Sequence, residues 1–158
     1  MSPLGHLALG ALAVRLGGYR GRAAACCLLG AFLPDLVDKP LGALGVVPSF
    51  HTVGHSVLVL GGAVGVVYLL GRGRPLLLGW ASHLVGDLPL AVPVYLDHYV
   101  WPVLAPSAPP AEPVRGYVLG YATSPAFAAE LGLFGLALWF VVRGPSAAER
   151  DRPRDDSP

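Results

Sequence analysis

Apolar residues occur along this chain in five long runs, separated by short polar or proline-rich segments. The runs cover residues 4–16, 23–33, 51–70, 75–92 and 114–142. Their length favours helices over strands, and proline punctuation predicts where they stop. Pro34 should end the second run, Pro75 suits the first turn of the fourth, and Pro125 should break or kink the last. The pattern therefore predicts an all-α protein.

The segments between the runs are expected to be loops. Residues 41–50 are punctuated by Gly and Pro, and residues 93–113 contain six prolines. After residue 142 the chain consists largely of Arg, Asp, Glu, Pro and Ser, which is typical of a disordered tail. We therefore predict one helical domain over residues 1–142 and a disordered polar tail over 143–158.

Composition indicates the environment in which the protein is expected to lie. Hydrophobic residues make up 54% of the chain and charged residues 13%, against roughly a quarter charged in soluble proteins. Mean hydropathy is +0.59. These values predict a polytopic membrane helix bundle of about five apolar helices in the lipid bilayer of the cell membrane. The first two runs are shorter than the ~20 residues that cross a bilayer upright. A net charge of +1 argues against a nucleic-acid partner.

Arginines predict an orientation for such a bundle. They follow the first run, the third run and the last run, and basic residues flank the cytoplasmic ends of membrane helices. The tail would then be cytoplasmic. On this scheme the histidines and aspartates of four runs fall toward the opposite, non-cytoplasmic end, namely His6, Asp35, Asp38, His51, His55, His83 and Asp87.

The pair His83 and Asp87 is the most informative part of this set. The two residues stand four apart, so they share one face of a helix in otherwise apolar surroundings. Burying ionisable groups is costly unless they have partners or a task. Imidazoles and carboxylates together bind divalent metals, zinc first, with manganese or iron as alternatives. A catalytic metal would polarise a phosphoryl or acyl oxygen and activate a bound water.

Individually, several of these residues have simpler explanations. Asp35 or Asp38 could cap a helix end, and His51 with His55 could form an interfacial pair. The polar groups could also merely satisfy one another. Glu130, midway along the last run, could pair with an arginine, stay protonated or line a polar path. His98, in the proline-rich loop, is predicted to be a surface residue.

Five short motifs, in order, resemble the family of membrane-bound metal-dependent hydrolases typified by the inner-membrane protein YdjM, a domain of unknown function. They are His6 in an apolar helix, Pro34-Asp35-Leu36-Val37-Asp38, Gly54-His55-Ser56, Ser82-His83-Leu84-Val85-Gly86-Asp87 and Trp101-Pro102. The chain departs from the family in two places. Thr52 stands where the family has an arginine, and Asp35 and Asp38 are three apart instead of two.

This family is in turn distantly similar to zinc-dependent phospholipase C and P1-type nucleases, which are all-helical metal phosphoesterases. The resemblance implies a set of metal ligands, namely His6, Asp35, His55, His83 and Asp87. We therefore predict a metal-dependent hydrolase of a phosphoester or lipid-linked ester, with Asp38 or His51 as general base. The alternative is a non-enzymatic membrane protein, such as a transporter, a metal-binding scaffold or a structural partner.

Overall fold

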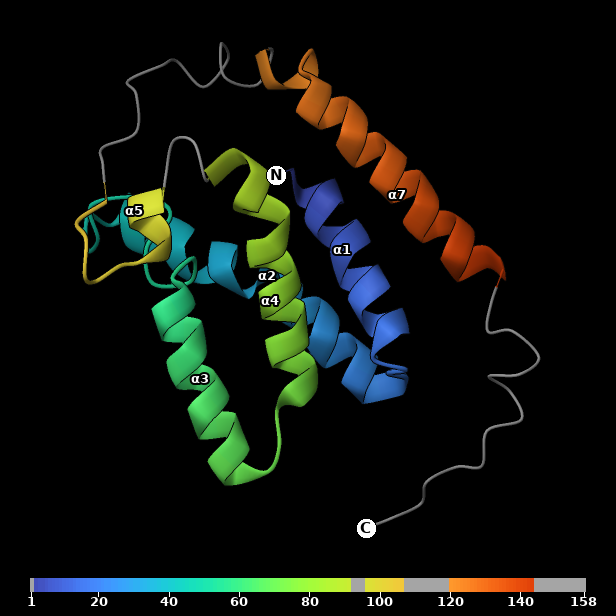
Figure 1. Ribbon diagram of the computed structural model, residues 1–158, viewed down its shortest axis with the longest axis horizontal. Coiled ribbons are helices and arrows are strands. Elements are labelled where there is room, and N and C mark those ends of the chain that lie inside the picture. Colours follow the sequence, from blue (N-terminus) through green and yellow to red (C-terminus); the bar gives the residue numbers. More distant parts are fainter. Residues whose placement is uncertain (1, 92–95, 107–119, 144–158) are drawn as a thin grey trace.

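The computed structural model describes residues 2–91, 96–106 and 120–143, and within these ranges it contains helices and turns but no strand (Figure 1). The all-α prediction is confirmed. The helices are α1 (Pro3–Leu16), α2 (Gly21–Ala43), α3 (Val57–Leu70), α4 (Arg74–Ala91), the short α5 (Leu96–Tyr99) and α7 (Pro125–Arg143). The predicted tail beyond Arg143 lies outside the described residues.

The membrane prediction is wrong. Among the helices in the described ranges, none is both long enough and apolar enough to cross a membrane. The most apolar helix, α3, has only 14 residues. The longest, α2, has 23 residues but carries Asp35, Asp38 and Lys39. A polytopic bundle in the cell membrane, with a cytoplasmic tail and a site at the non-cytoplasmic end, is therefore not supported.

Helix α2 is longer than its apolar run. It passes through Pro34 and Pro40 without ending, although each proline lacks a backbone N–H. Pro34 is completely buried, and α2 packs along both α1 and α4. Tertiary packing thus overrides the local helix-breaking preference. As a result Asp35 and Asp38 lie on a helix, one turn apart, and not in a turn.

The third apolar run, by contrast, begins as a loop. Residues 44–56 form turns and bends, and α3 starts only at Val57. Ser56 caps this helix, because its side chain accepts hydrogen bonds from the N–H groups of Leu58 and Val59. His51 and His55 therefore lie in the turns that precede α3, and not on one helical face.

The bundle is built around the crossing of α2 and α4 (Figure 1). A Cβ added at Gly79 of α4 would lie 1.9 Å from the carbonyl oxygen of Cys27 on α2. One added at Gly30 of α2 would lie 2.1 Å from the carbonyl oxygen of Leu76 on α4. Only glycine permits so close an approach of two helix backbones. Helix α1 packs on both helices, and α7 lies along α1.

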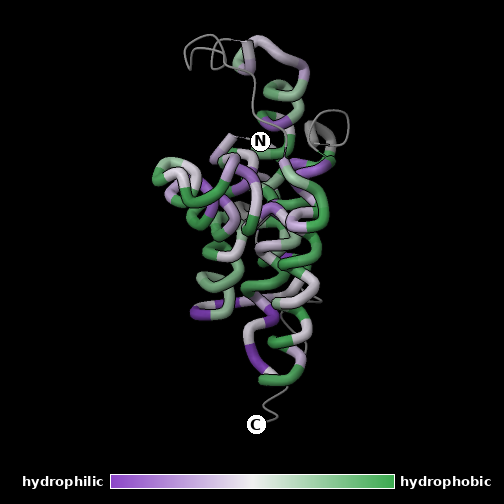
Figure 2. Tube along the Cα trace, turned by 90° about the vertical axis from the view of Figure 1, so that its left-hand side faces the viewer, coloured by the Kyte–Doolittle hydropathy of each residue, from purple (hydrophilic) through white to green (hydrophobic). Residues whose placement is uncertain are grey.

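The interior of this bundle is unusually polar. A small apolar cluster forms around Trp80, Leu84 and Tyr99. The largest completely buried side chains are nevertheless mostly polar, and they include four histidines: His6, His55, His83 and His98. Many large apolar side chains are exposed instead, and Figure 2 shows apolar residues along much of the helical backbone. The polar interior must therefore be held by specific partners.

We predict that Gly79→Ala destabilises the protein by at least about 1–3 kcal/mol, the usual cost of overpacking a close contact. The new methyl group would overlap the backbone of α2. Gly61→Ala on α3 is the matched control, because a Cβ there meets nothing within 4 Å. This second change should stabilise the helix by about 0.5–1 kcal/mol. Urea unfolding followed by circular dichroism measures both, and equal effects would contradict the close crossing.

Candidate metal centre

The crossing of α2 and α4 brings the predicted metal-binding residues together from three helices and one loop. Together with His51, which was predicted as a general base, they form two groups whose ligand atoms, within each group, all lie within 4.8 Å of one another. The inner group is buried and consists of His6, His83 and Asp87. The outer group is partly exposed and consists of Asp35, His51 and His55. Each group contains the kinds of atom that could hold a metal ion.

The inner group joins α1 to α4. The rings of His6 and His83 stack, with centroids 3.7 Å apart and an interplanar angle of 9°. His6 Nε2 lies 3.6 Å from one carboxylate oxygen of Asp87, and His83 Nε2 lies 3.5 Å from the other. His83 and Asp87 share a helical face as predicted, and α1 supplies the third member.

His55 connects the two groups. Its Nε2 atom lies 3.1 Å from His83 Nε2 and 3.6 Å from Asp87 Oδ2 in the inner group. The same atom lies 3.8 Å from Asp35 Oδ1 in the outer group. One imidazole nitrogen thus faces ligand atoms of both groups, which makes the cluster continuous.

The second nitrogen of each central ring is already engaged. His83 Nδ1 lies 2.7 Å from the carbonyl oxygen of Ala31, an acceptor that requires a proton on Nδ1. His55 Nδ1 lies 2.8 Å from the carboxylate of Asp38. In the neutral rings the Nε2 lone pairs therefore point at each other across 3.1 Å. Two facing lone pairs repel each other, so this contact is favourable only with a cation between the rings. The cation is either a proton on one ring or a metal ion.

Asp38 holds the loop that carries His55. It is completely buried and accepts hydrogen bonds from the backbone N–H groups of Thr52, Gly54 and His55 as well as from the His55 ring. Burial raises the pKa of this carboxyl. The hydrogen bonds from His55 and from the backbone together lower the pKa by more than burial raises it, so the net pKa is below its ordinary value. The ionised group thus orients His55. A role for Asp38 as general base stays a prediction.

The electrostatics of the inner group suit metal binding. Burial, followed by the nearby His83, lowers the pKa of His6 to about 3, so this ring stays neutral. Burial also lowers the pKa of His83. For Asp87 burial acts in the opposite direction, but the hydrogen bond with His55 and the nearby positive charges together outweigh it, so the pKa falls below its ordinary value. Neutral imidazoles and an ionised carboxylate are the protonation states that bind divalent metals.

His55 differs from its neighbours. Burial lowers its pKa, but Asp38 and Asp87 outweigh burial, so the net pKa is raised. His55 is therefore the ring that takes a proton when no metal ion is bound, and the proton relieves the contact with His83 Nε2. A metal ion at this position would have to displace that proton.

The outer group marks the side on which the cluster opens. His51 is exposed, and its ring meets that of His55 edge to face at a centroid distance of 4.4 Å. Asp35 is partly buried, and Lys39 Nζ lies 2.6 Å from its Oδ2 atom. Burial raises the pKa of Asp35. The hydrogen bond and charge of Lys39, with the nearby histidines, lower the pKa by more than burial raises it, so the net pKa is below its ordinary value.

His98 was predicted to be a surface residue, and this is wrong. Its exposed fraction is 2%, and its ring centroid lies 6.1 Å from that of His51. The reason is that α5 is tied to α4, because the Tyr99 hydroxyl donates to the carbonyl oxygen of Leu84 at 2.8 Å. Proline content alone did not reveal this anchor. A fifth histidine therefore lies beside the outer group.

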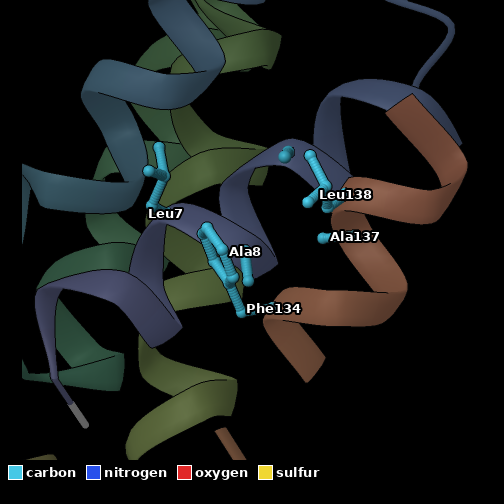
Figure 3. A pocket seen from close by; sticks show the side chains of 6 residues that line it. Leu7, Ala8, Phe134, Ala137 and Leu138 are labelled. Atoms are coloured by element: carbon cyan, nitrogen blue, oxygen red, sulfur yellow. The ribbon is translucent and has the colours of Figure 1, made fainter. Parts of the chain in front are cut away.

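A hollow lies away from the two groups of His and Asp residues. It is a pocket of about 200 Å³ between α1 and α7, lined only by apolar side chains, among them Leu7, Ala8 and Phe134 (Figure 3). Leu7 and Ala8 follow His6 directly, but successive helical residues point about 100° apart. The pocket therefore does not join the His/Asp cluster, and it offers no polar atom for chemistry.

Fold and site together define an all-helical protein with buried histidine and aspartate groups that could hold a metal ion. No family model, no curated protein and no solved structure matches the chain. The resemblance to the YdjM-like hydrolases therefore stays a prediction, and the function must be argued from the site itself.

We predict that Asp38→Asn weakens metal binding 10- to 100-fold, the usual effect of removing the partner that orients a ligating histidine. The amide cannot accept all of the hydrogen bonds that the carboxylate now accepts, so His55 loses its fixed orientation. Asp97→Asn on α5 is the matched control, since Asp97 belongs to neither group. Zinc titration of the folded proteins measures the effect, and equal affinities in the two variants would contradict this role.

Proposed function

We propose that this protein is a metal-dependent hydrolase whose metal ion is held by His6, His83 and Asp87 together with His55. The observation that carries the proposal is the spacing of the ligand atoms of these four residues. His55 Nε2, His83 Nε2 and Asp87 Oδ2 are separated by 3.1, 3.5 and 3.6 Å, and His6 Nε2 lies 3.6 Å from the other oxygen of Asp87, Oδ1. Ligands of tetrahedral zinc, with bonds of about 2.0–2.1 Å, stand roughly 3.3 Å apart.

Zinc is the metal that this set suits best. Three imidazoles and one carboxylate are ligands typical of zinc, whereas calcium and magnesium prefer oxygen. Manganese and iron accept the same ligands and stay as alternatives. A bound zinc ion would supply a Lewis acid and, with a water added to these four protein ligands, would lower the pKa of that water toward 7. The protein supplies the fixed rings, because Ala31 and Asp38 hold His83 and His55 in the ligating tautomer.

The outer group then faces the reactants. The inner ligands are buried, so water and substrate must approach on the side of Asp35 and His51. Asp35 Oδ1 lies 3.8 Å from His55 Nε2 and would orient the attacking water. His51 is exposed beside His55 and can accept that water's proton. We prefer His51 to Asp38 as the base, because Asp38 lies behind His55 and is saturated with hydrogen bonds.

Lys39 favours an anionic substrate, and hence a phosphoester. The carboxylates of the cluster would repel an anion, but Lys39 adds a positive charge on the open side, 2.6 Å from Asp35 Oδ2. About half of its side chain surface is exposed, so its remaining protons can reach a phosphoryl oxygen. This lysine, the only one in the chain, offers the cation that the missing arginine at Thr52 would have supplied.

Metal analysis tests the proposal most directly. We expect at least one stoichiometric divalent ion per wild-type chain after gentle purification. His83→Ala and Asp87→Asn should each reduce the metal content to a small fraction of this. Gly61→Ala, which touches no ligand, should keep the full complement. A wild-type protein that neither retains nor rebinds zinc would overturn the proposal, whereas bound metal without phosphoesterase activity would favour a metal-binding scaffold.

Substrate class is tested by Lys39→Ala and Lys39→Arg. With bis(p-nitrophenyl) phosphate we expect Lys39→Ala to raise KM about tenfold, the effect of losing roughly 1.4 kcal/mol of charge-assisted binding. Lys39→Arg should restore much of this binding. Hydrolysis of p-nitrophenyl acetate, which is neutral, should be unaffected by either change. A parallel loss on both substrates would show that Lys39 acts on the site as a whole and not on the anion.

A further inference from the structure

Glu130 is a buried carboxylate that the proposed chemistry does not use. It lies in the second turn of α7, where a charge is costly to bury, and its exposed fraction is 5%. Its partners come from the beginning of the chain and from the segment before α7. Ser2 donates its backbone N–H to both carboxylate oxygens, at 3.0 and 3.2 Å, and its hydroxyl to one of them. Tyr121 donates its hydroxyl to the other.

Ser2 passes this anchor on to α1. It is the N-cap of the helix, and its hydroxyl oxygen accepts a hydrogen bond from Gly5 N–H at 3.3 Å. Its carbonyl oxygen accepts a hydrogen bond from the N–H of His6 at 3.2 Å. Since the hydroxyl proton of Ser2 goes to Glu130, its oxygen is left facing Gly5. Glu130 thus fixes the orientation of the Ser2 hydroxyl and, through this N-cap, the first turn of α1.

The negative charge of Glu130 also stabilises the start of α1. The N-terminus of a helix carries a partial positive charge, and an anion placed there stabilises it. Helix α1 has no acidic residue in its own first turn, and Glu130 of α7 supplies the charge from outside. The contact lies one helical turn ahead of His6, whose ring must stay stacked on His83 and within 3.6 Å of Asp87.

We propose that Glu130 is a positioning residue for the metal centre, and that it acts by fixing the start of α1 so that His6 reaches the inner group. This inference rests on the proposed metal site. It gives the buried carboxylate of α7 a role that differs from the polar path and from the arginine pair considered for Glu130 in the sequence analysis. It also explains how His6, near the start of α1, keeps a defined place.

The test compares cobalt and zinc titrations of wild type, Glu130→Gln, His6→Ala and the double variant, well below the unfolding temperature. We expect Glu130→Gln to weaken cobalt binding about tenfold and to alter its visible absorption. In the His6→Ala background the same change should have no further effect, because Glu130 acts through His6. Ala137→Gly is the control, since it weakens α7 at a buried position of the same helix without touching Ser2.

A second readout needs no metal. In the metal-free protein, the nuclear magnetic resonance signals of the His6 ring should carry a shift from stacking on His83, and Glu130→Gln should reduce it. Ser2→Ala, which keeps the carboxylate, should weaken cobalt binding in the same direction by less. Additive losses in the double variant, or unchanged binding and ring shift in Glu130→Gln, would overturn this inference alone. Failure of wild type to bind cobalt or zinc would overturn the proposed function instead.

Discussion

Burial of polar side chains is the constraint on which the rest of this structure depends. A helical bundle normally gains its stability from apolar side chains in its centre, yet the centre here holds histidines and aspartates. Each of these must find a partner, because an unsatisfied buried polar group costs about 1–3 kcal/mol. The close crossing of α2 and α4, the loop clamped by Asp38 and the stacked rings of His6 and His83 all serve this requirement.

The requirement also explains why backbone atoms take part in the site. The carbonyl oxygen of Ala31 can bind His83 only because α2 approaches α4 so closely, and glycines at positions 30 and 79 permit that approach. The loop before α3 is held in a similar way, since Trp80 of α4 donates its indole N–H to the carbonyl oxygen of Gly54 at 2.6 Å. Helix packing and ligand orientation are therefore one problem in this protein.

Sequence reasoning predicted the helical class and α4 well, because long apolar runs and a proline in the first turn are local signals. It also predicted the break at Pro125, where α7 begins. It failed where distant packing decides the outcome, as at Pro34, which α2 passes through. It failed again in the reading of composition, because hydrophobic content says little about how long each apolar helix is.

The candidate site was predicted in part for a related reason. The spacing of His83 and Asp87 is a helical signal, so their shared face could be seen in the sequence. The burial of His98 and the orientation of His55 by Asp38 depend on contacts between α5 and α4 and within a loop, which no local pattern reveals. Lys39 stood four residues from Asp35, a spacing that does signal an ion pair on a helix.

The contact between Ser2 and Glu130 spans 128 positions of the chain. Such a pairing cannot form during synthesis until α7 has been made. Until then the first helix, already complete, lacks the carboxylate that caps it. The start of α1 is therefore fixed only when α7 is present, and a chain interrupted before α7 would present His83, Asp87 and His55 without a fixed His6.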